Sequence, residues 1–186
     1  MQAENIITDN QIIATENQLL LSDIRMRYVL YTKSHHEKFV ESQLLKKEIE
    51  AFTPKITLRK RWSDRVKLIE KPLFKSYCFA KFSLTDKIKI VSQLGVVNIV
   101  HFNNQYLPVP DSVINSLKIL TENKIKLGPY PYLKIGKKIV IGNGPLKGLE
   151  GYIVEKRNKH TSLVVSVDAI ASSIKCVVDV DYIDLA

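Results

Sequence analysis

The chain lacks the features that mark exported or membrane-bound proteins. Its first 24 residues contain no Lys or Arg, so the basic start of a signal peptide is missing. The apolar stretch Leu19-Leu20-Leu21 is far too short for a signal-peptide core or a membrane span. We therefore expect the protein to act in the cytoplasm, without a membrane partner.

Cysteine is also scarce, with two residues in 186. Cys78 and Cys176 lie far apart in apolar runs, and neither has a second Cys or His at metal-ligand spacing. The pattern predicts buried free thiols and no disulfide or zinc site. His35 and His36 are adjacent, whereas metal ligands on a helix are four residues apart. We expect no metal and no cofactor.

No acid/base pair and no nucleophile with an attendant base emerges from the sequence, so we expect that the protein is not an enzyme. What the chain has is positive charge, with a net value of +9. Residues 1–24 hold four acids and no bases, residues 25–132 hold 20 bases and 9 acids, and residues 133–186 hold 8 and 6. A basic middle segment favours polyanions, of which nucleic acid is the simplest, although a solvated basic face without a partner has the same composition.

Three glycines crowd the stretch GPLKGLEGYIVEK, residues 144–156. A phosphate-binding P-loop needs Lys and a hydroxyl residue after its last glycine, but Leu149 follows Gly148 and Tyr152 follows Gly151. The residues that follow are typical of a strand and not of the helix that a dinucleotide site requires. The pattern predicts a tight turn at Gly144-Pro145. It also predicts that the other glycines lie where a strongly bent strand leaves no room for a Cβ atom.

The N-terminal half alternates strand and helix patterns after a weakly patterned extension. We expect strands at 27–31, 72–82 and 96–102, helices at 35–47, 85–94 and 111–123, and a basic hairpin with extended arms at 56–58 and 66–70. The expected helix caps are Thr85 or Asp86 and, after Pro110, Asp111. In the strand at 72–82, Tyr77 and Phe79 share one face, and we expect this face to be exposed.

Beyond a segment rich in Gly and Pro, every pattern is strand-like. We expect short strands at 138–141, 150–155, 162–167 and 174–180. So few strands favour one small closed barrel, which hides its edges. The domains expected are an extension (1–24), an N-terminal domain (25–123), a linker (124–132) and a C-terminal domain (133–186). The fold class is α+β: an antiparallel sheet flanked by helices forms an α/β sandwich, and an SH3-like β-barrel follows it.

Three stretches together resemble the NusG family of transcription factors. RYVLYTKSHHEKFVESQLLKKEIEAFTPK and PLFKSYCFAKF resemble its N-terminal (NGN) domain, and the glycine run resembles its KOW motif, here Gly144, Pro145, Gly148 and Gly151. HEKFVESQLLKKEIEAFTPK and WSDRVKLIEKPLF look most like the specialised UpxY-type and RfaH-type paralogues. The resemblance implies an antitermination or elongation factor, specialised for particular polysaccharide-biosynthesis operons.

The resemblance also implies partners and contact residues. The clamp helices of the largest RNA polymerase subunit would contact Tyr31, Tyr77, Phe79 and Ile99, although buried core positions for these residues are the alternative. The non-template DNA strand would meet Lys33, with His35, His36 and Lys38 beside it, although an exposed polar helix start without a partner is the alternative. At the hairpin tip, Arg59, Lys60, Arg61 and Arg65 would reach upstream duplex or the polymerase surface. Trp62 would stack on a base or pack under the hairpin.

The chain departs from the family pattern at two places. Lys75-Ser76 stands where typical members have Pro-Gly, which softens a rigid turn, and Asp86-Lys87-Ile88 replaces a His-Thr-Thr contact loop of RfaH. In the family the KOW domain recruits Rho or a small-subunit ribosomal protein, and RfaH refolds this domain into helices. The Val and Ile density of residues 162–180 predicts a stable barrel here.

Two other functions fit parts of the sequence. One is a general housekeeping NusG-like elongation factor. The other is an RNA-binding, ribosome-associated KOW protein, which is less favoured because the basic excess lies in the N-terminal half.

Overall fold

The computed structural model describes residues 23–62, 64–123, 125, 127–132, 138–157 and 160–179. The extension expected at 1–24 lies almost entirely outside these residues. Within them, no helix is long and apolar enough to cross a membrane.

The N-terminal half is built on a four-stranded sheet in the order β2-β5-β1-β6. Its central strands, β1 (Met26–Thr32) and β5 (Tyr77–Phe82), pair antiparallel, and β2 (Ala51–Phe52) and β6 (Val96–Ile99) lie outside them. Residues of β1 alternate between the two faces. Both faces are covered, because Val29 and Leu30 are 1% and 0% exposed.

Two helices cover the Leu30 face of this sheet. Helix α2 (Glu37–Leu45) contributes Val40 and Leu44, and α3 (Lys87–Val91) contributes Ile90, to a buried cluster with Leu30 and Cys78. Helix α2 starts at Glu37, later than the sequence pattern predicted, because His35 lies in a turn with a φ of +64°. The 3₁₀ turn η1 (Leu84–Asp86) precedes α3.

Of the two predicted capping assignments, one is confirmed by position and the other is wrong. Asp86 stands at the N-cap of α3, although its side chain makes no capping hydrogen bond, and the Ser83 hydroxyl caps η1 by accepting a hydrogen bond from the Thr85 amide at 3.2 Å. Helix α4 (Asp111–Glu122) is preceded by Pro110 at its N-cap. Asp111 is a helical residue whose carboxylate accepts a hydrogen bond from the buried Arg27 guanidinium at 3.1 Å, because a long-range ion pair competes with the local cap.

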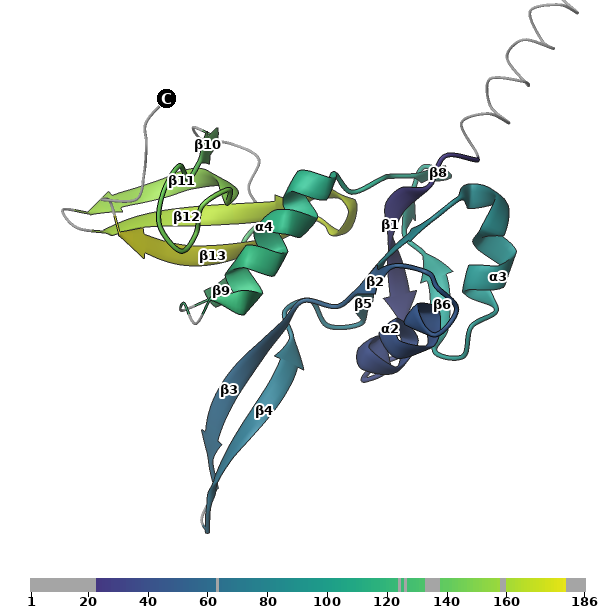
Figure 1. Cartoon of the computed structure of the whole chain (residues 1–186), viewed down its shortest axis with the longest axis horizontal. Helices are drawn as coiled ribbons and strands as arrows, with labels where there is room; N and C mark the ends of the chain where they lie inside the picture. Colours follow the sequence, from purple (N-terminus) through teal and green to yellow (C-terminus); the bar gives the residue numbers. More distant parts are fainter. Residues whose placement is uncertain are drawn as a thin grey trace, which may run out of the picture.

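Two hairpins stand apart from the central sheet. Strands β3 (Lys55–Arg61) and β4 (Val66–Pro72) pair over seven positions and form a long basic hairpin that projects away from the rest of the molecule (Figure 1). The expected basic hairpin is therefore present. The predicted strand at 96–102 is divided at Val100 into β6 and β7 (His101–Phe102), and β7 pairs with β8 (Gln105–Tyr106).

The C-terminal half is a five-stranded antiparallel sheet in the order β10-β11-β12-β13-β9. Its strands are β9 (Leu127–Tyr130), β10 (Lys138–Val140), β11 (Glu150–Arg157), β12 (His160–Val167) and β13 (Ser172–Asp179), with the 3₁₀ turn η2 (Asp168–Ile170) between the last two. Strand β9 lies inside the expected linker and pairs with β13. Within the described residues, the end strands β9 and β10 do not pair with each other.

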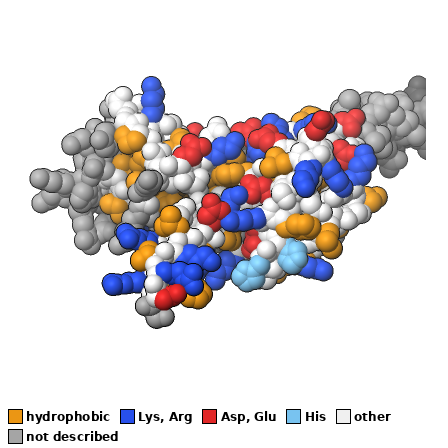
Figure 2. All heavy atoms as spheres, turned by 60° about the horizontal axis from the view of Figure 1, so that its bottom comes forward, with side chains coloured by type: hydrophobic (Ala, Val, Ile, Leu, Met, Phe, Trp, Pro, Cys, Tyr) orange, Lys and Arg blue, Asp and Glu red, His pale blue; other side chains and the backbone are white. Residues whose placement is uncertain are grey.

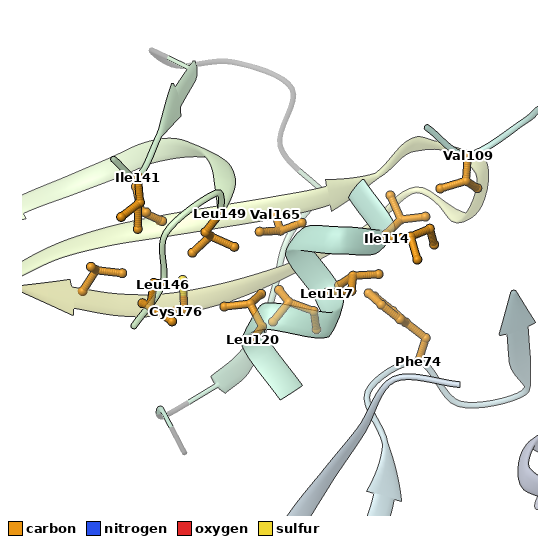
Figure 3. Close-up of a cluster of buried hydrophobic side chains, with 14 of the residues drawn as sticks. Phe74, Val109, Ile114, Leu117, Leu120, Ile141, Leu146, Leu149, Val165 and Cys176 are labelled. Atoms are coloured by element: carbon orange, nitrogen blue, oxygen red, sulfur yellow. The ribbon is translucent and has the colours of Figure 1, made fainter. Parts of the chain in front are cut away.

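Helix α4 joins the two halves. One continuous buried cluster contains Val29 and Phe79 of the N-terminal sheet, Leu117 of α4, and Leu163 of the C-terminal sheet. Figure 3 shows the α4 leucines and Phe74 directed into this cluster beside Leu149 and Val165. The Glu150 amide also donates to the buried Ser116 hydroxyl on α4 at 2.9 Å. The two halves therefore pack as one body.

Candidate functional site

Two exposed tyrosines lie together where the central strands of the N-terminal sheet end. Tyr31 on β1 stands opposite Tyr77 on β5 in the strand register. Their ring centroids are 5.7 Å apart, with the ring planes tilted by 53°. Tyr31 is 44% exposed and Tyr77 is half-buried. Paired aromatic rings with large accessible area make good anchors for a protein partner, since they have few rotatable bonds.

Phe79 and Ile99 do not belong to this exposed pair, so the expectation of an exposed face that includes Phe79 is wrong. Phe79 is 0% exposed and packs against Phe74, with ring centroids 6.2 Å apart. Ile99 is 1% exposed. It pairs with Leu30 and so lies on the opposite face of the sheet from Tyr31. Both faces are covered by helices, and the alternation of the strand could not reveal this.

The turn before Tyr77 is held by hydrogen bonds to the backbone amide and the backbone carbonyl of Ser76. Ser76 has a φ of +63°, in the left-handed region that costs a residue with a Cβ atom. Its amide donates to the Glu37 carboxylate at 2.7 Å, and its carbonyl accepts from the Thr32 amide at 2.8 Å. Glu37 is 5% exposed. The sequence showed Glu37 only as an acid near a helix start, and no local pattern connects it to Ser76.

The residues expected at the DNA strand lie just beyond β1, next to this turn. Lys33 and His35 are exposed. The His36 ring is half-buried and meets the Phe39 ring edge-on, with centroids 6.2 Å apart. Lys38 forms an ion pair with Glu70 of the hairpin, and this hydrogen bond lowers the pKa of the Glu70 carboxyl. Lys33 and His35 are therefore better placed than Lys38 to meet a ligand.

The hairpin presents most of the remaining predicted basic residues. Arg59, Arg61 and Arg65 are exposed, although Arg65 also pairs with Asp64 at 3.0 Å. The side chain of Lys60 lies outside the described residues. Trp62 is 53% exposed, so about half of its surface is accessible to a partner. On the face drawn in Figure 2, Lys and Arg side chains and histidines lie near one another along the same side of the molecule.

Apolar side chains alternate with these bases on the hairpin. Leu58, Val66 and Leu68 are 41%, 47% and 68% exposed. A two-stranded hairpin has little core of its own, so these aliphatic side chains stay accessible between the basic ones.

A cluster of ion pairs around the buried Arg27 fixes the other end of β1. Arg27 is 5% exposed and its guanidinium donates to Glu50 at 2.7 Å and to Asp111 at 3.1 Å. The hydrogen bonds from Arg27 hold the pKa of both carboxyls below their usual values. This cluster ties β1 to the start of α4, so its role is in the fold.

The glycines of the expected KOW motif build a turn. Gly144 and Gly148 have φ values of +77° and +85°, and the Gly148 amide donates to the Ile141 carbonyl at 2.8 Å. A Cβ atom on Gly151 would lie 3.0 Å from the Val164 carbonyl oxygen. The prediction of a tight turn followed by a strand without room for a side chain is confirmed. Pro145 is an exposed residue of the same turn.

Both cysteines are free and buried, and burial raises the pKa of each thiol to about 12. Neither is a thiolate near neutral pH, so nucleophilic cysteine chemistry is excluded at these positions. Within the described residues, no group of three His, Cys, Asp or Glu side chains is arranged to hold a metal ion.

Comparison with known proteins finds a family match in the N-terminal half of the chain. Residues 27–118 match the model of the NusG family, described as transcription termination factor nusG, and so have the sequence pattern of a NusG-family domain. No curated protein matches the chain. The solved structures that match include "Domain interaction in Thermotoga maritima NusG", with 17% sequence identity over 88% of this chain and 98% of that chain and a TM-score of 0.47.

Proposed function

We propose that the chain is a transcription elongation or antitermination factor that binds RNA polymerase through its N-terminal domain. The observation that carries the proposal is the exposed Tyr31–Tyr77 pair, which lies inside the residues that match the NusG family. The protein acts by binding and not by catalysis, in the cytoplasm where its polymerase works.

The tyrosine pair contacts the clamp helices of the largest polymerase subunit. A factor changes the behaviour of polymerase only if it binds one state of the enzyme better than another. The pair must therefore grip the closed, pause-resistant clamp more tightly than the open one. Phe79 and Ile99 support this surface from within the fold, since neither is accessible.

Lys33 and His35 meet the non-template DNA strand beside this contact. Both are exposed next to the turn that carries Tyr77. The hairpin, through Arg59, Arg61 and Arg65, reaches the upstream duplex, since a two-stranded ribbon fits the major groove of DNA. We further propose, from the resemblance to UpxY-type and RfaH-type paralogues, that the protein serves particular polysaccharide-biosynthesis operons.

The C-terminal sheet is proposed to be a KOW domain with an SH3-like barrel fold. The glycine turn supports this, with Gly144 and Gly148 in the left-handed region and Gly151 in close contact with β12. Its partner in the family is Rho or a small-subunit ribosomal protein, and either is proposed here. Strands β12 and β13 pair over eight positions, which favours a stable sheet over a refolded helical form.

Binding of the full chain to core RNA polymerase tests the proposal. Loss of an aromatic anchor commonly costs about 2 kcal/mol, so Tyr31→Ala with Tyr77→Ala together should weaken binding by at least about 30-fold. Phe102→Ala is the matched control, because Phe102 is an aromatic with 68% exposure on β7. Wild-type affinity in the double variant would reject the proposed polymerase surface.

A further inference from the structure

A groove with a volume of about 620 Å³ lies between the foot of the hairpin and the C-terminal sheet. On the N-terminal side it is lined by Lys71, Lys75 and Tyr77. Because Tyr77 also belongs to the exposed tyrosine pair, the groove and the pair adjoin. From the other side it is lined by β9 and the two residues after it, which bring Tyr130 and Tyr132. No expectation from the sequence brought these two walls together, because they come from segments that are far apart in the chain.

The tyrosines on the C-terminal wall are held by specific contacts. The Tyr130 ring has the Lys175 ammonium 5.6 Å from its centroid, and Tyr130 stands opposite Ser173 in the pairing of β9 with β13. The Tyr132 hydroxyl donates to the Asp168 carboxylate at 3.0 Å, while 39% of the residue stays exposed. Both rings are thus attached to the sheet with part of their surface open.

The charged side chains that line the groove are basic. Among the described residues that line it, two are lysines and none is Asp or Glu. The positive surface continues in two directions. Lys71 belongs to the hairpin, whose residues 55–72 contain seven Lys or Arg and two Asp or Glu. The turn that carries Lys75 is hydrogen-bonded to β1 through Thr32, next to Lys33.

We propose that this groove binds a single strand of DNA, the displaced strand of the transcribed duplex, which continues into it from Lys33. Bases stack on Tyr130 and Tyr132, and Lys71 and Lys75 meet the phosphates. Aromatic platforms in a positive groove are the usual means of holding single strands without reading their sequence. A neutral peptide would use the aromatic rings but gain nothing from the lysines. The inference rests on the proposed function, because that function supplies the displaced strand.

Fluorescence anisotropy of a labelled 15-nucleotide DNA strand with the full chain tests the site. Tyr130→Leu and Tyr132→Leu keep apolar bulk and remove the stacking surface, so each should weaken binding by about tenfold. Phe102→Leu is the control for the loss of an exposed aromatic outside the groove. Lys71→Ala with Lys75→Ala should reduce the slope of log K against log salt by about 0.7 for each phosphate that the lysines no longer neutralise.

Separate measurements distinguish failure of the groove from failure of the proposed function. Polymerase affinity should not change in the Tyr130→Leu and Tyr132→Leu variants, since Tyr31 and Tyr77 are intact. DNA binding equal to wild type in the leucine variants would overturn the groove while leaving the polymerase contact in place. An RNA strand of the same sequence that binds tightly through these tyrosines, with DNA binding weakly, would also overturn the proposal, because RNA would then be the ligand.

Discussion

The hydrogen bond between Glu37 and Ser76 gives the sharpest prediction about how the site is built. The Glu37 carboxylate is 5% exposed and accepts from the Ser76 amide at 2.7 Å. Hydrogen bonds to charged groups contribute about 1.5–3 kcal/mol, and a buried amide left without its partner costs a similar amount. Glu37→Ala should therefore lower the free energy of unfolding by about 2–3 kcal/mol.

Two further variants separate the hydrogen bond from other effects of the substitution. Glu37→Gln keeps an acceptor oxygen and loses only the charge, so its cost should be about 1 kcal/mol, closer to a neutral hydrogen bond. Ser76→Gly removes the strain of a left-handed residue from the folded state, which is worth about 1–2 kcal/mol. Glycine also gives the unfolded chain more conformational entropy, and this cancels most of the gain. Its net effect should be small, between zero and about 1 kcal/mol of stabilisation.

Urea unfolding followed by far-UV circular dichroism measures all three variants. This probe is preferable to Trp62 fluorescence, because Trp62 lies at the exposed hairpin tip. The expected order of stability is Ser76→Gly, wild type, Glu37→Gln and then Glu37→Ala. If Glu37→Ala were within about 0.5 kcal/mol of wild type, the size of a neutral surface substitution, the turn would not depend on this carboxylate.

Two more predictions concern the fold. Gly151→Ala forces a Cβ atom against the Val164 carbonyl, so it should destabilise the protein by about 1–3 kcal/mol. Gly128→Ala is the control, because nothing lies within 4 Å of its added Cβ atom, and it should be neutral or stabilising. Equal unfolding midpoints for the Gly151→Ala and Gly128→Ala variants would contradict the close approach at Gly151. The two carboxyls bound to Arg27 have pKa values below normal, so they contribute stability above their ordinary pKa, near 4, which is lost as pH falls through the lower folded values. Urea unfolding between pH 6 and 2 should therefore depend on pH less steeply in Arg27→Met, and an unchanged profile would show that the cluster does not produce the dependence.

Strand and helix positions were readable from the sequence where the pattern is local. The alternation around Tyr77, the helical face with Val40 and Leu44, and the glycine turn all specify their own conformation. What covers each face is decided by distant residues. Phe79 looked like a residue of an exposed face because nothing near it indicates that α4 and the C-terminal sheet would bury it.

Contacts between distant residues also decide how the chain divides into domains and a linker, and a local pattern does not reveal them. Residues 124–132 look like a linker by their Gly and Pro content, yet β9 lies within them and pairs with β13. The apolar side of α4 that carries Leu117 and Leu120 packs against the C-terminal sheet. A fragment that ends at residue 126 would expose this side to water, so polymerase binding is better tested with the full chain.

Single-round transcription on a template with a defined pause site tests the central claim most directly. The polymerase should come from the same cells as the protein, and the template should be varied upstream of the pause. We expect that the full chain shortens the pause, that Tyr31→Ala with Tyr77→Ala abolishes the effect, and that Phe102→Ala retains it. Pause lifetimes that are the same with wild type and with the double variant would contradict the proposed function.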